Sequence, residues 1–442
     1  MGFWHMSSNE HSSEVGGDRA ARARSRTGAG LCLPALAMLT LATAPVCWVK
    51  DAHALWGDRL EPFVAYGVTR DDNVFRISGQ SDPMTVLGTP SKADTFSTTS
   101  IGLNLDLPLS RQRILGGLSF NQNRYDQFTV LNFTERHGRA IWQWQAGNEF
   151  SGQLGYTMDR ALASLANVQE GGFQSGTPNP LETKKAFGDA TYLLTPRWQL
   201  RGEASRLTQA NGIPQQLVND MTNNSGGLGL SYVTPADTRI GLHMQRQDAK
   251  LPNEQLVNGT LVDNSYRQDR LAIVADWTIS GVSRLRASAG SVQRSFAQLP
   301  ERDFATGIFH ADYDWKPTGK FTLVVAARKD IGAPDEINAG VNIGFVLVKD
   351  IALRPAYRMT EKVSLSGLLR YGDWEYLGDP GMVLGTVPPR SDRVSTVALA
   401  IAYEPIRAVR LGLGLRRETR TSTADFGDYK ANIVDLSARL AF

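Results

Sequence analysis

The two-residue alternation of apolar and polar side chains that recurs along the chain constrains its fold more than any other feature. The alternation is clearest in residues 429–442. There Val434, Leu436, Ala438, Leu440 and Phe442 alternate with Asp435, Ser437 and Arg439. Because successive side chains of a strand point to opposite faces, this stretch is predicted to be a strand with one apolar and one polar face. Such a strand suits the wall of an outer-membrane barrel, and equally the edge of an ordinary β-sandwich.

The connections between alternating segments fall into two length classes that take turns along the chain. Short turns carry Pro or Gly, as in residues 108–111, 195–196 and 316–319. Long polar loops separate the hairpins, among them residues 71–94, 121–137, 159–185 and 372–392. Short and long connections segregate to opposite ends in bacterial barrels. The sequence therefore predicts an all-β fold, a transmembrane antiparallel β-barrel of about 18 strands (alternative 16), with short periplasmic turns and long extracellular loops.

Residues 337–359 decide whether the number of strands is even. They could form two strands with a turn at Lys349 and Asp350. However, the apolar positions on both sides of that point are all odd-numbered: Val341, Ile343, Phe345, Leu347, Ile351, Leu353 and Tyr357. A face with a two-residue period that continues through the candidate turn indicates one long strand. The count is then even, as in bacterial single-chain barrels.

Large aromatic residues gather beside the short turns. They are Trp144, Trp198, Trp277, Trp315, Tyr232 and Tyr403. Aromatic girdles of this kind mark the membrane interface of outer-membrane barrels. The competing interpretation is an all-β protein of many short strands without a membrane. The girdle, the loop asymmetry, the terminal Phe442 and the character of the first residues together favour the barrel.

The first 54 residues have the three parts of a secretory signal peptide. Arginines stand at positions 19, 22, 24 and 26, a mostly apolar run covers residues 31–49, and Ala52-His53-Ala54 fits a small-x-small cleavage site. We expect residues 1–54 to be removed and residues 55–442 to form the barrel. A transmembrane anchor is the alternative, because the apolar run is near the length of about 18 residues that a spanning helix needs.

Both cysteines, Cys32 and Cys47, lie in this leader. Residues 55–442 therefore contain neither disulfides nor thiolate metal sites. Leu31 precedes Cys32 and Val46 precedes Cys47, whereas a lipoprotein signal needs a small residue there, so no lipid anchor is expected. The net charge of the whole chain is only +3. Proteins that bind nucleic acid usually carry a larger positive charge, so no nucleic-acid binding is expected.

Catalytic and metal-binding patterns are weak in this sequence. There is no Gly-x-Ser-x-Gly and no His-Glu-x-x-His motif, so no enzyme activity, cofactor or metal is expected. The triplet Asp71-Asp72-Asn73 resembles the start of a calcium loop, but the Gly and the distal Glu of such a loop do not follow. It is interpreted as a polar loop tip.

Two groups of residues are candidates for contact with a solute. The alternation points charged side chains into the lumen, with Arg201, Glu203, Arg286, Asp312, Arg410, Arg416, Asp435 and Arg439 as candidate lining residues. A barrel of this size is wide enough for an aqueous channel, although a salt-bridged network that only stabilises the wall is the alternative. The second group is Asp373, Trp374, Glu375, Tyr376 and Asp379, which could contact sugar from an extracellular loop or could simply be solvated there.

Several stretches, taken in order, resemble the EpsL family of outer-membrane barrels, which is associated with exosortase/PEP-CTERM exopolysaccharide loci. They are residues 72–76 (Asp-Asn-Val-Phe-Arg), 262–268 (Val-Asp-Asn-Ser-Tyr-Arg-Gln), 313–320 (Tyr-Asp-Trp-Lys-Pro-Thr-Gly-Lys), 376–381 (Tyr-Leu-Gly-Asp-Pro-Gly) and 436–442 (Leu-Ser-Ala-Arg-Leu-Ala-Phe). The resemblance covers essentially all of residues 55–442. It implies a role in exporting or assembling extracellular polysaccharide.

The functional expectation is therefore an outer-membrane conduit that passes a polysaccharide from the periplasm to the cell surface. Its expected partners are outer-membrane lipid, the polysaccharide, and periplasmic export and assembly proteins, without nucleic acid. A general diffusion porin for small solutes is the first alternative, and a non-conducting scaffold or receptor is the second.

Overall fold

In the computed structural model of the chain, most of the described residues belong to β-strands of a single sheet. The structure describes residues 59–165, 178–257, 259–332, 345–377 and 390–442. The predicted signal peptide, with Cys32 and Cys47, lies outside these residues. Among the described residues, no helix is both long and apolar enough to cross a membrane.

The main sheet has 18 antiparallel strands, as predicted. Its first half comprises β1 (Leu60–Asp71), β2 (Asp94–Leu109), β3 (Gln112–Tyr125), β4 (Phe133–Ala146), β5 (Phe150–Leu162), β6 (Pro180–Leu193), β7 (Trp198–Asn211), β8 (Met221–Val233) and β9 (Arg239–Lys250). Its second half comprises β12 (Tyr266–Ser280), β13 (Ser283–Phe296), β14 (Phe304–Trp315), β15 (Phe321–Ile331), β16 (Phe345–Arg358), β17 (Val363–Leu377), β18 (Arg390–Ile406), β19 (Val409–Ser422) and β20 (Tyr429–Ala441). A short helix α2 (Pro83–Leu87) and the hairpin of β10 (Gln255–Val257) and β11 (Thr260–Val262) lie in the long connections.

The sheet closes on itself between its first and last strands. β1 pairs with β2 on one side and with β20 on the other, and Val64 lies opposite Leu440 across that seam. The backbone N–H of Phe442 donates to the carbonyl of Pro62 at 2.9 Å. Residues 429–442 therefore form the closing strand, as their alternation predicts, and the barrel has no free edge.

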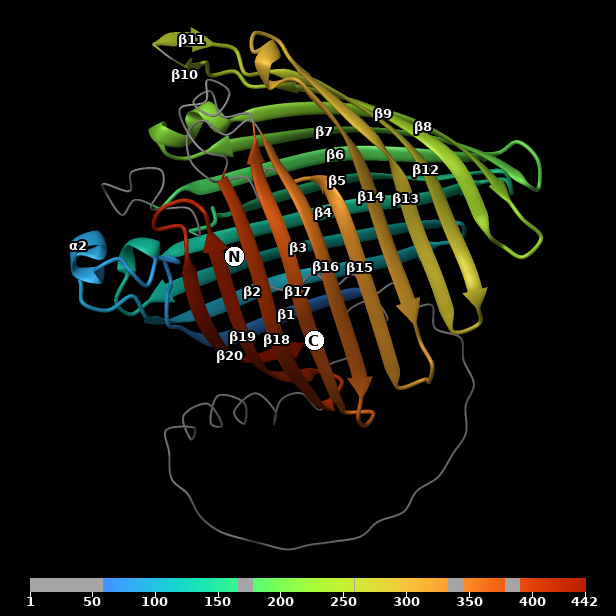
Figure 1. Cartoon of the computed structure of the whole chain (residues 1–442). Coiled ribbons are helices and arrows are strands. Elements are labelled where there is room, and N and C mark those ends of the chain that lie inside the picture. The colour runs from blue at the N-terminus through green and yellow to red at the C-terminus, as the bar shows by residue number, and fades with distance from the viewer. Residues whose placement is uncertain (1–58, 166–177, 258, 333–344, 378–389) are drawn as a thin grey trace, which may run out of the picture.

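The two ends of the barrel differ as the connection lengths predict. Tight hairpins join pairs such as β2–β3 and β4–β5, and the second of these turns uses Gly147 at a φ of 63°. Figure 1 shows α2 and the β10–β11 hairpin at the opposite end, among the long connections. Predicted girdle residues meet beside the tight turns, since the rings of Trp198 and Tyr232 lie 5.2 Å apart.

The single long strand predicted within residues 337–359, which makes the number of strands even, is confirmed from Phe345 onward. β16 runs without a break through Lys349 and Asp350 and pairs with β15 and β17. Several strands extend further toward the long loops than predicted, for example β17 to Leu377 and β6 from Pro180. These ends carry polar residues on both faces. Their backbone groups still pair with the neighbouring strands, although no lipid imposes an apolar alternation on them.

Candidate lumen and mouth of the barrel

The inward face of each strand is identified by the large apolar side chains exposed on its other face. On β7, Trp198 and Leu200 are exposed outside, so Arg201 and Glu203 face the lumen. The same reasoning places all eight predicted lining residues on the inner face: Arg201 and Glu203 on β7, Arg286 on β13, Asp312 on β14, Arg410 and Arg416 on β19, and Asp435 and Arg439 on β20.

The inward charges pair with neighbours along the wall. Arg201 lies 3.4 Å from Asp189 on β6, and Arg439 lies 2.7 Å from Glu61 on β1. Arg286 is opposite Asp312 in the register but forms its ion pair with Asp314, at 2.8 Å. These three pairs each join adjacent strands, so they reinforce the wall.

The remaining predicted residues also have neighbours on the wall. Glu203 lies 3.2 Å from His243, and Arg416 lies 3.1 Å from Glu418. Arg410 is 3.6 Å from Glu404. Asp435 packs over Gly414, where an added Cβ would lie only 2.2 Å from its Oδ1 atom. Glycine at this inward position therefore makes room for the carboxylate.

Pairing does not remove these side chains from solvent. The exposed fractions of the Arg201, Arg286 and Arg410 side chains are 49%, 51% and 61%. An ion pair at such exposure contributes about 0–1 kcal/mol to stability. The arginines therefore present charge to the lumen more than they hold the fold together.

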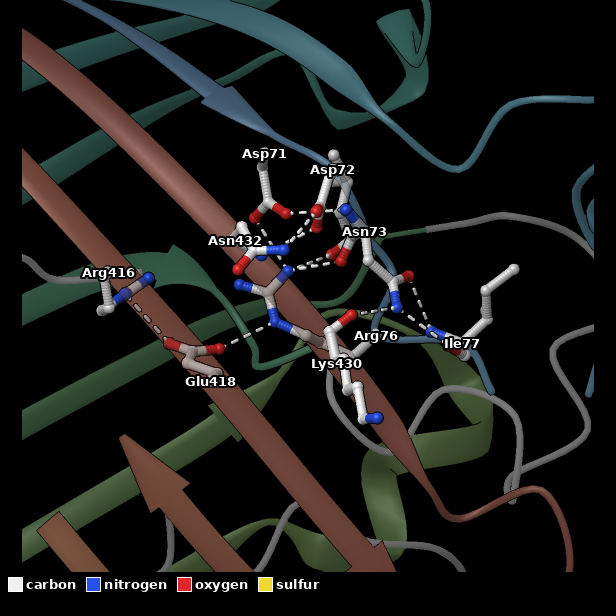
Figure 2. A network of polar contacts seen from close by, with 10 residues as sticks. Asp71, Asp72, Asn73, Arg76, Ile77, Arg416, Glu418, Lys430 and Asn432 are labelled. Carbon is white, nitrogen blue, oxygen red and sulfur yellow. Dashed lines mark hydrogen bonds and ion pairs between the residues drawn. The ribbon is translucent and has the colours of Figure 1, made fainter. Parts of the chain in front are cut away.

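The first long connection folds into the mouth of the barrel and is held there by Arg76. Its Nη1 atom donates to Asp71 Oδ2 at 2.8 Å, and its Nε atom donates to Glu418 Oε2 on β19 at 2.9 Å (Figure 2). The same guanidinium donates to the carbonyl of Asn73 at 2.5 Å. Burial alone would lower the pKa of Arg76, but the carboxylates of Glu418 and Asp71 raise it above its ordinary value. Arg76 therefore remains charged although its side chain is buried.

Asn73 fixes the turn that brings Arg76 into place. Its side chain accepts from the N–H of Ile77 at 3.0 Å and donates to the carbonyls of Ile77 at 2.8 Å and Lys430 at 3.0 Å. Arg76 has a φ of 55°, a conformation that is uncommon for a residue other than glycine. The surrounding contacts hold this conformation, as expected for a strained residue that the structure over-determines.

Asp72 joins the same segment to the closing strand. Its carboxylate accepts from the backbone N–H and from the side-chain amide of Asn432, both at 2.7 Å. Its own backbone N–H donates to the carbonyl of Asn432 at 3.2 Å. We call Asp71, Asp72, Asn73, Arg76, Glu418 and Asn432 the mouth clamp. This clamp spans β1, β20 and β19, the strands at the closure of the barrel (Figure 2).

An apolar cluster anchors the inward-folded segment on its other side. Val74, Phe75 and Ile77 are buried against side chains from the inner faces of β2 and β3 and from the next two long connections. These partners are Phe96, Tyr125, Phe128, Leu131 and Leu165. Phe75 and Phe128 meet edge to face with ring centroids 4.8 Å apart. The segment therefore occupies part of the mouth as a packed element.

The interpretation of Asp71-Asp72-Asn73 as a polar loop tip is wrong. Asp71 and Asn73 are buried, and their polar atoms are engaged by Arg76, Ile77 and Lys430. The sequence could not reveal this, because Glu418 and Asn432, the partners of Arg76 and Asp72, lie some 340 to 360 positions further along the chain. The described residues contain no cluster of three or more metal-ligating side chains.

The predicted sugar-contact residues that the structure describes do not lie in an extracellular loop, contrary to the sequence prediction. Asp373, Trp374, Glu375 and Tyr376 belong to β17, not to an extracellular loop, and Asp379 lies outside the described residues. Asp373 and Glu375 are on the outer face, where they pair with Arg393 and Lys349. Trp374 and Tyr376 are on the inner face. The sequence predicts a loop here because an acidic, aromatic stretch followed by Gly and Pro lacks the apolar alternation of a membrane-spanning strand.

Tyr376 belongs to a second packed group at the mouth. It is only 3% exposed, and the Arg390 guanidinium lies 4.0 Å from its ring centroid. Arg390 donates to both oxygens of the buried Asp392, at 3.0 and 2.6 Å. Ser422 Oγ donates to the same carboxylate at 2.5 Å. This burial leaves the Tyr376 ring unavailable for stacking on a sugar.

Comparison with known proteins gives one family match and several structural likenesses. Residues 283–442, from the start of β13 to the end of the chain, match the family described as "Putative beta-barrel porin 2". None of the curated proteins compared with the chain matches it. Among solved structures, the chain is similar to OccK2 (OpdF) of Pseudomonas aeruginosa, with 12% identity over 88% of this chain and 99% of that chain, and a TM-score of 0.48.

Two further solved structures resemble the chain at the same level. One is a BenF-like porin from Pseudomonas fluorescens Pf-5, with 13% identity, coverage of 87% and 99%, and a TM-score of 0.48. The other is Pseudomonas aeruginosa OpdK with vanillate, with 10% identity, coverage of 87% and 99%, and a TM-score of 0.46. The closed sheet of 18 antiparallel strands and its exposed apolar outer face make the chain a β-barrel of the bacterial outer membrane, and residues 283–442 are similar to a porin family.

Proposed function

We propose that the barrel is a passive channel for small solutes across the outer membrane. The observation that carries this proposal is the exposure of the lumen arginines: Arg201, Arg286 and Arg410 pair along the wall yet keep about half of their side-chain surface open. A lumen filled by a rigid salt-bridged network would bury such side chains. The porin family matched by residues 283–442 supports the same function. The proposal requires no catalytic step.

The inward-folded segment of residues 72–78 gives this channel a defined mouth. It narrows the opening on the side of β1, β19 and β20, where Arg76 and Glu418 hold it. Passage is then limited by the space that this segment leaves and by the charges below it. A narrowed, charged opening selects small polar solutes by size and charge.

Planar-bilayer recording of the purified, refolded barrel tests this function. We expect stepwise openings, and we expect the double variant Arg201→Glu, Arg286→Glu to shift the ion selectivity toward cations. The matched variant Arg246→Glu, Arg267→Glu changes two arginines on the outer face and should leave the selectivity unchanged. A barrel that is folded, as judged by circular dichroism, but electrically silent would contradict the proposal.

The polysaccharide conduit implied by the EpsL resemblance differs from this proposal in its cargo. Two of the stretches that carry the resemblance have structural roles here: Asp72 and Arg76 belong to the mouth clamp, and Tyr376 lies beneath Arg390. These structural roles favour neither a polysaccharide nor a small solute as the cargo. A strain that lacks the gene for this barrel separates the two functions. Loss of surface polysaccharide with normal uptake of small solutes would favour the polysaccharide conduit and its periplasmic partners.

A further inference from the structure

The outer face of β4 to β7 carries an unbalanced group of cations near its extracellular end. The outward positions, which alternate with the lumen-facing ones, include Arg136 on β4, Arg160 on β5, Lys184 on β6 and Arg206 on β7. The only outward carboxylate on these strands is Glu182, which pairs with Lys184. In the part of the chain that the structure describes, Arg136, Arg160 and Arg206 form no ion pair.

Two of these cations face each other directly. Arg136 is the cross-strand partner of Arg160 in the register of β4 and β5. Like charges in directly opposed positions destabilise a sheet. An anion between them would remove the repulsion and accept charge-assisted hydrogen bonds from both guanidinium groups.

Between β9 and β12, by contrast, the outward arginines of the outer face are balanced by carboxylates. Arg246 contacts both oxygens of Asp269, at 2.7 and 3.1 Å, and Arg267 lies 2.9 Å from Asp248. There each outward arginine has its own carboxylate.

An apolar groove lies on the same strands and is lined at one edge by Arg206. It has a volume of about 800 Å³ and runs over the small side chains of Ala140, Ala186 and Ala204. Trp142, Leu154 and Tyr156 form its larger apolar walls. The register places Tyr156 opposite Ala186, and Ala186 opposite Arg206, so Arg206 borders the groove. Arg136 and Arg160 lie four positions beyond this row on β4 and β5.

The height of Arg206 fits the headgroup level of the outer leaflet. It lies eight positions beyond Trp198, which stands at the opposite aromatic girdle. At about 3.3 Å per residue and a tilt of about 40°, this separation spans about 20 Å of an apolar band about 25 Å tall. A lipid headgroup at this level would contact the cations while its acyl chain lies below them.

We propose that this surface binds one phosphate-bearing lipid of the outer leaflet. Its phosphate lies between Arg136 and Arg160, and one acyl chain fills the groove over Ala140, Ala186 and Ala204, which Arg206 borders. The lipid explains both features together, because a purely apolar occupant leaves the cations unpaired and a free anion leaves the groove empty. This inference does not depend on what passes through the lumen.

Native mass spectrometry of the refolded barrel in detergent tests the proposal, with bis-phosphorylated lipid A as the probe and its dephosphorylated form as the reference. We expect tighter binding of the phosphorylated lipid. The double variant Arg136→Gln, Arg160→Gln should weaken this binding about thirtyfold. The matched double variant Arg246→Gln, Arg267→Gln should retain it.

A second pair of variants tests the groove separately. Ala186→Leu with Ala204→Leu fills it and should weaken binding, whereas Ala275→Leu with Ala287→Leu adds the same atoms to the outer face of β12 and β13 and should not. Equal binding of the dephosphorylated lipid, or equal losses in the matched variants, would overturn the proposal. Light scattering gives a further test. If the barrel is an oligomer and the variant with the filled groove is a monomer, the occupant of the groove is a second copy of the chain, and the proposal is overturned.

Discussion

Arg76 and Glu418 are joined at 2.9 Å although 342 positions of sequence separate them. Arg76 lies in the first long connection and Glu418 lies on β19, so this contact ties the beginning of the barrel to its end. Asp71 completes the site from the other side of the guanidinium. The mouth segment therefore depends on a buried charge that is matched by carboxylates on two strands.

Replacing Arg76 should release the mouth segment without opening the barrel wall. Arg76→Met leaves Asp71 buried without its cation, and the loss of one partner of a buried pair costs about 3–5 kcal/mol. We expect rapid proteolysis within residues 72–93 and a larger conductance per channel. Limited proteolysis followed by mass spectrometry measures the first effect, and bilayer recording measures the second.

Arg70→Met is the matched control for that variant. Arg70 is one residue before Asp71, but its side chain is exposed, and among the described residues it donates only to Thr95 Oγ1, at 3.1 Å. Its removal should change neither proteolysis nor conductance. Equal protease resistance in Arg76→Met and the unaltered protein would show that the buried charge does not hold the segment.

Asn73 should tolerate neither Ala nor Asp. Asn73→Ala leaves the N–H of Ile77 and two carbonyls without partners, at about 1–3 kcal/mol for each buried group left unsatisfied. Asn73→Asp directs a negative charge at those same carbonyls. Hydrogen exchange at the Ile77 amide should accelerate in both variants, and slow exchange in either would contradict the assigned geometry.

Gly372 should be intolerant of a methyl group. It lies opposite Asp350 on the inner face, and an added Cβ would be 2.0 Å from Asp350 Oδ1. That carboxylate is nearly buried between Arg328 and Arg370, at 2.8 and 2.6 Å. Gly372→Ala should lower the free energy of unfolding by about 1–3 kcal/mol through overpacking, measured by urea unfolding in lipid vesicles. Gly307→Ala, whose added Cβ has no atom nearer than 3.8 Å, should have little effect, and equal losses would refute the packing argument.

The outward ion pair between Arg246 and Asp269 should contribute little to stability. The two side chains are 61% and 47% exposed. Exposed pairs contribute about 0–1 kcal/mol. A double-mutant cycle with Arg246→Gln and Asp269→Asn should therefore give a small coupling energy in urea unfolding, well below that of Arg76 with Glu418. A coupling above that of the buried pair would contradict this ranking.

The membrane-spanning part of the fold could be predicted from the sequence because lipid imposes a strict pattern there. The closing strand, the tight turns beside Trp198 and the continuity of β16 through Lys349 and Asp350 all follow from the two-residue period. Above the membrane no such pattern is imposed. The stretch from Asp373 to Tyr376 is a strand that lacks this pattern, so the sequence predicts a loop there.

The inward positions could be predicted and the mouth clamp could not, because the two depend on residues at different distances along the sequence. Arg201 and Glu203 could be placed on the inner face from their neighbours in sequence alone. Arg76 could not be placed in this way, because its burial depends on Glu418 and on Phe75 packing against Phe128. One sequence carries no local signal for such distant partners.

The seam between β1 and β20 also determines the order in which the barrel can fold. The partners of the first connection, Glu418 and Asn432, lie on β19 and β20, and the mouth clamp needs these strands in register with β1. Bringing together segments so distant in sequence is entropically unfavourable and slow. We therefore expect the first connection to dock only after closure, so that its docking reports that the cylinder has been sealed in the native register.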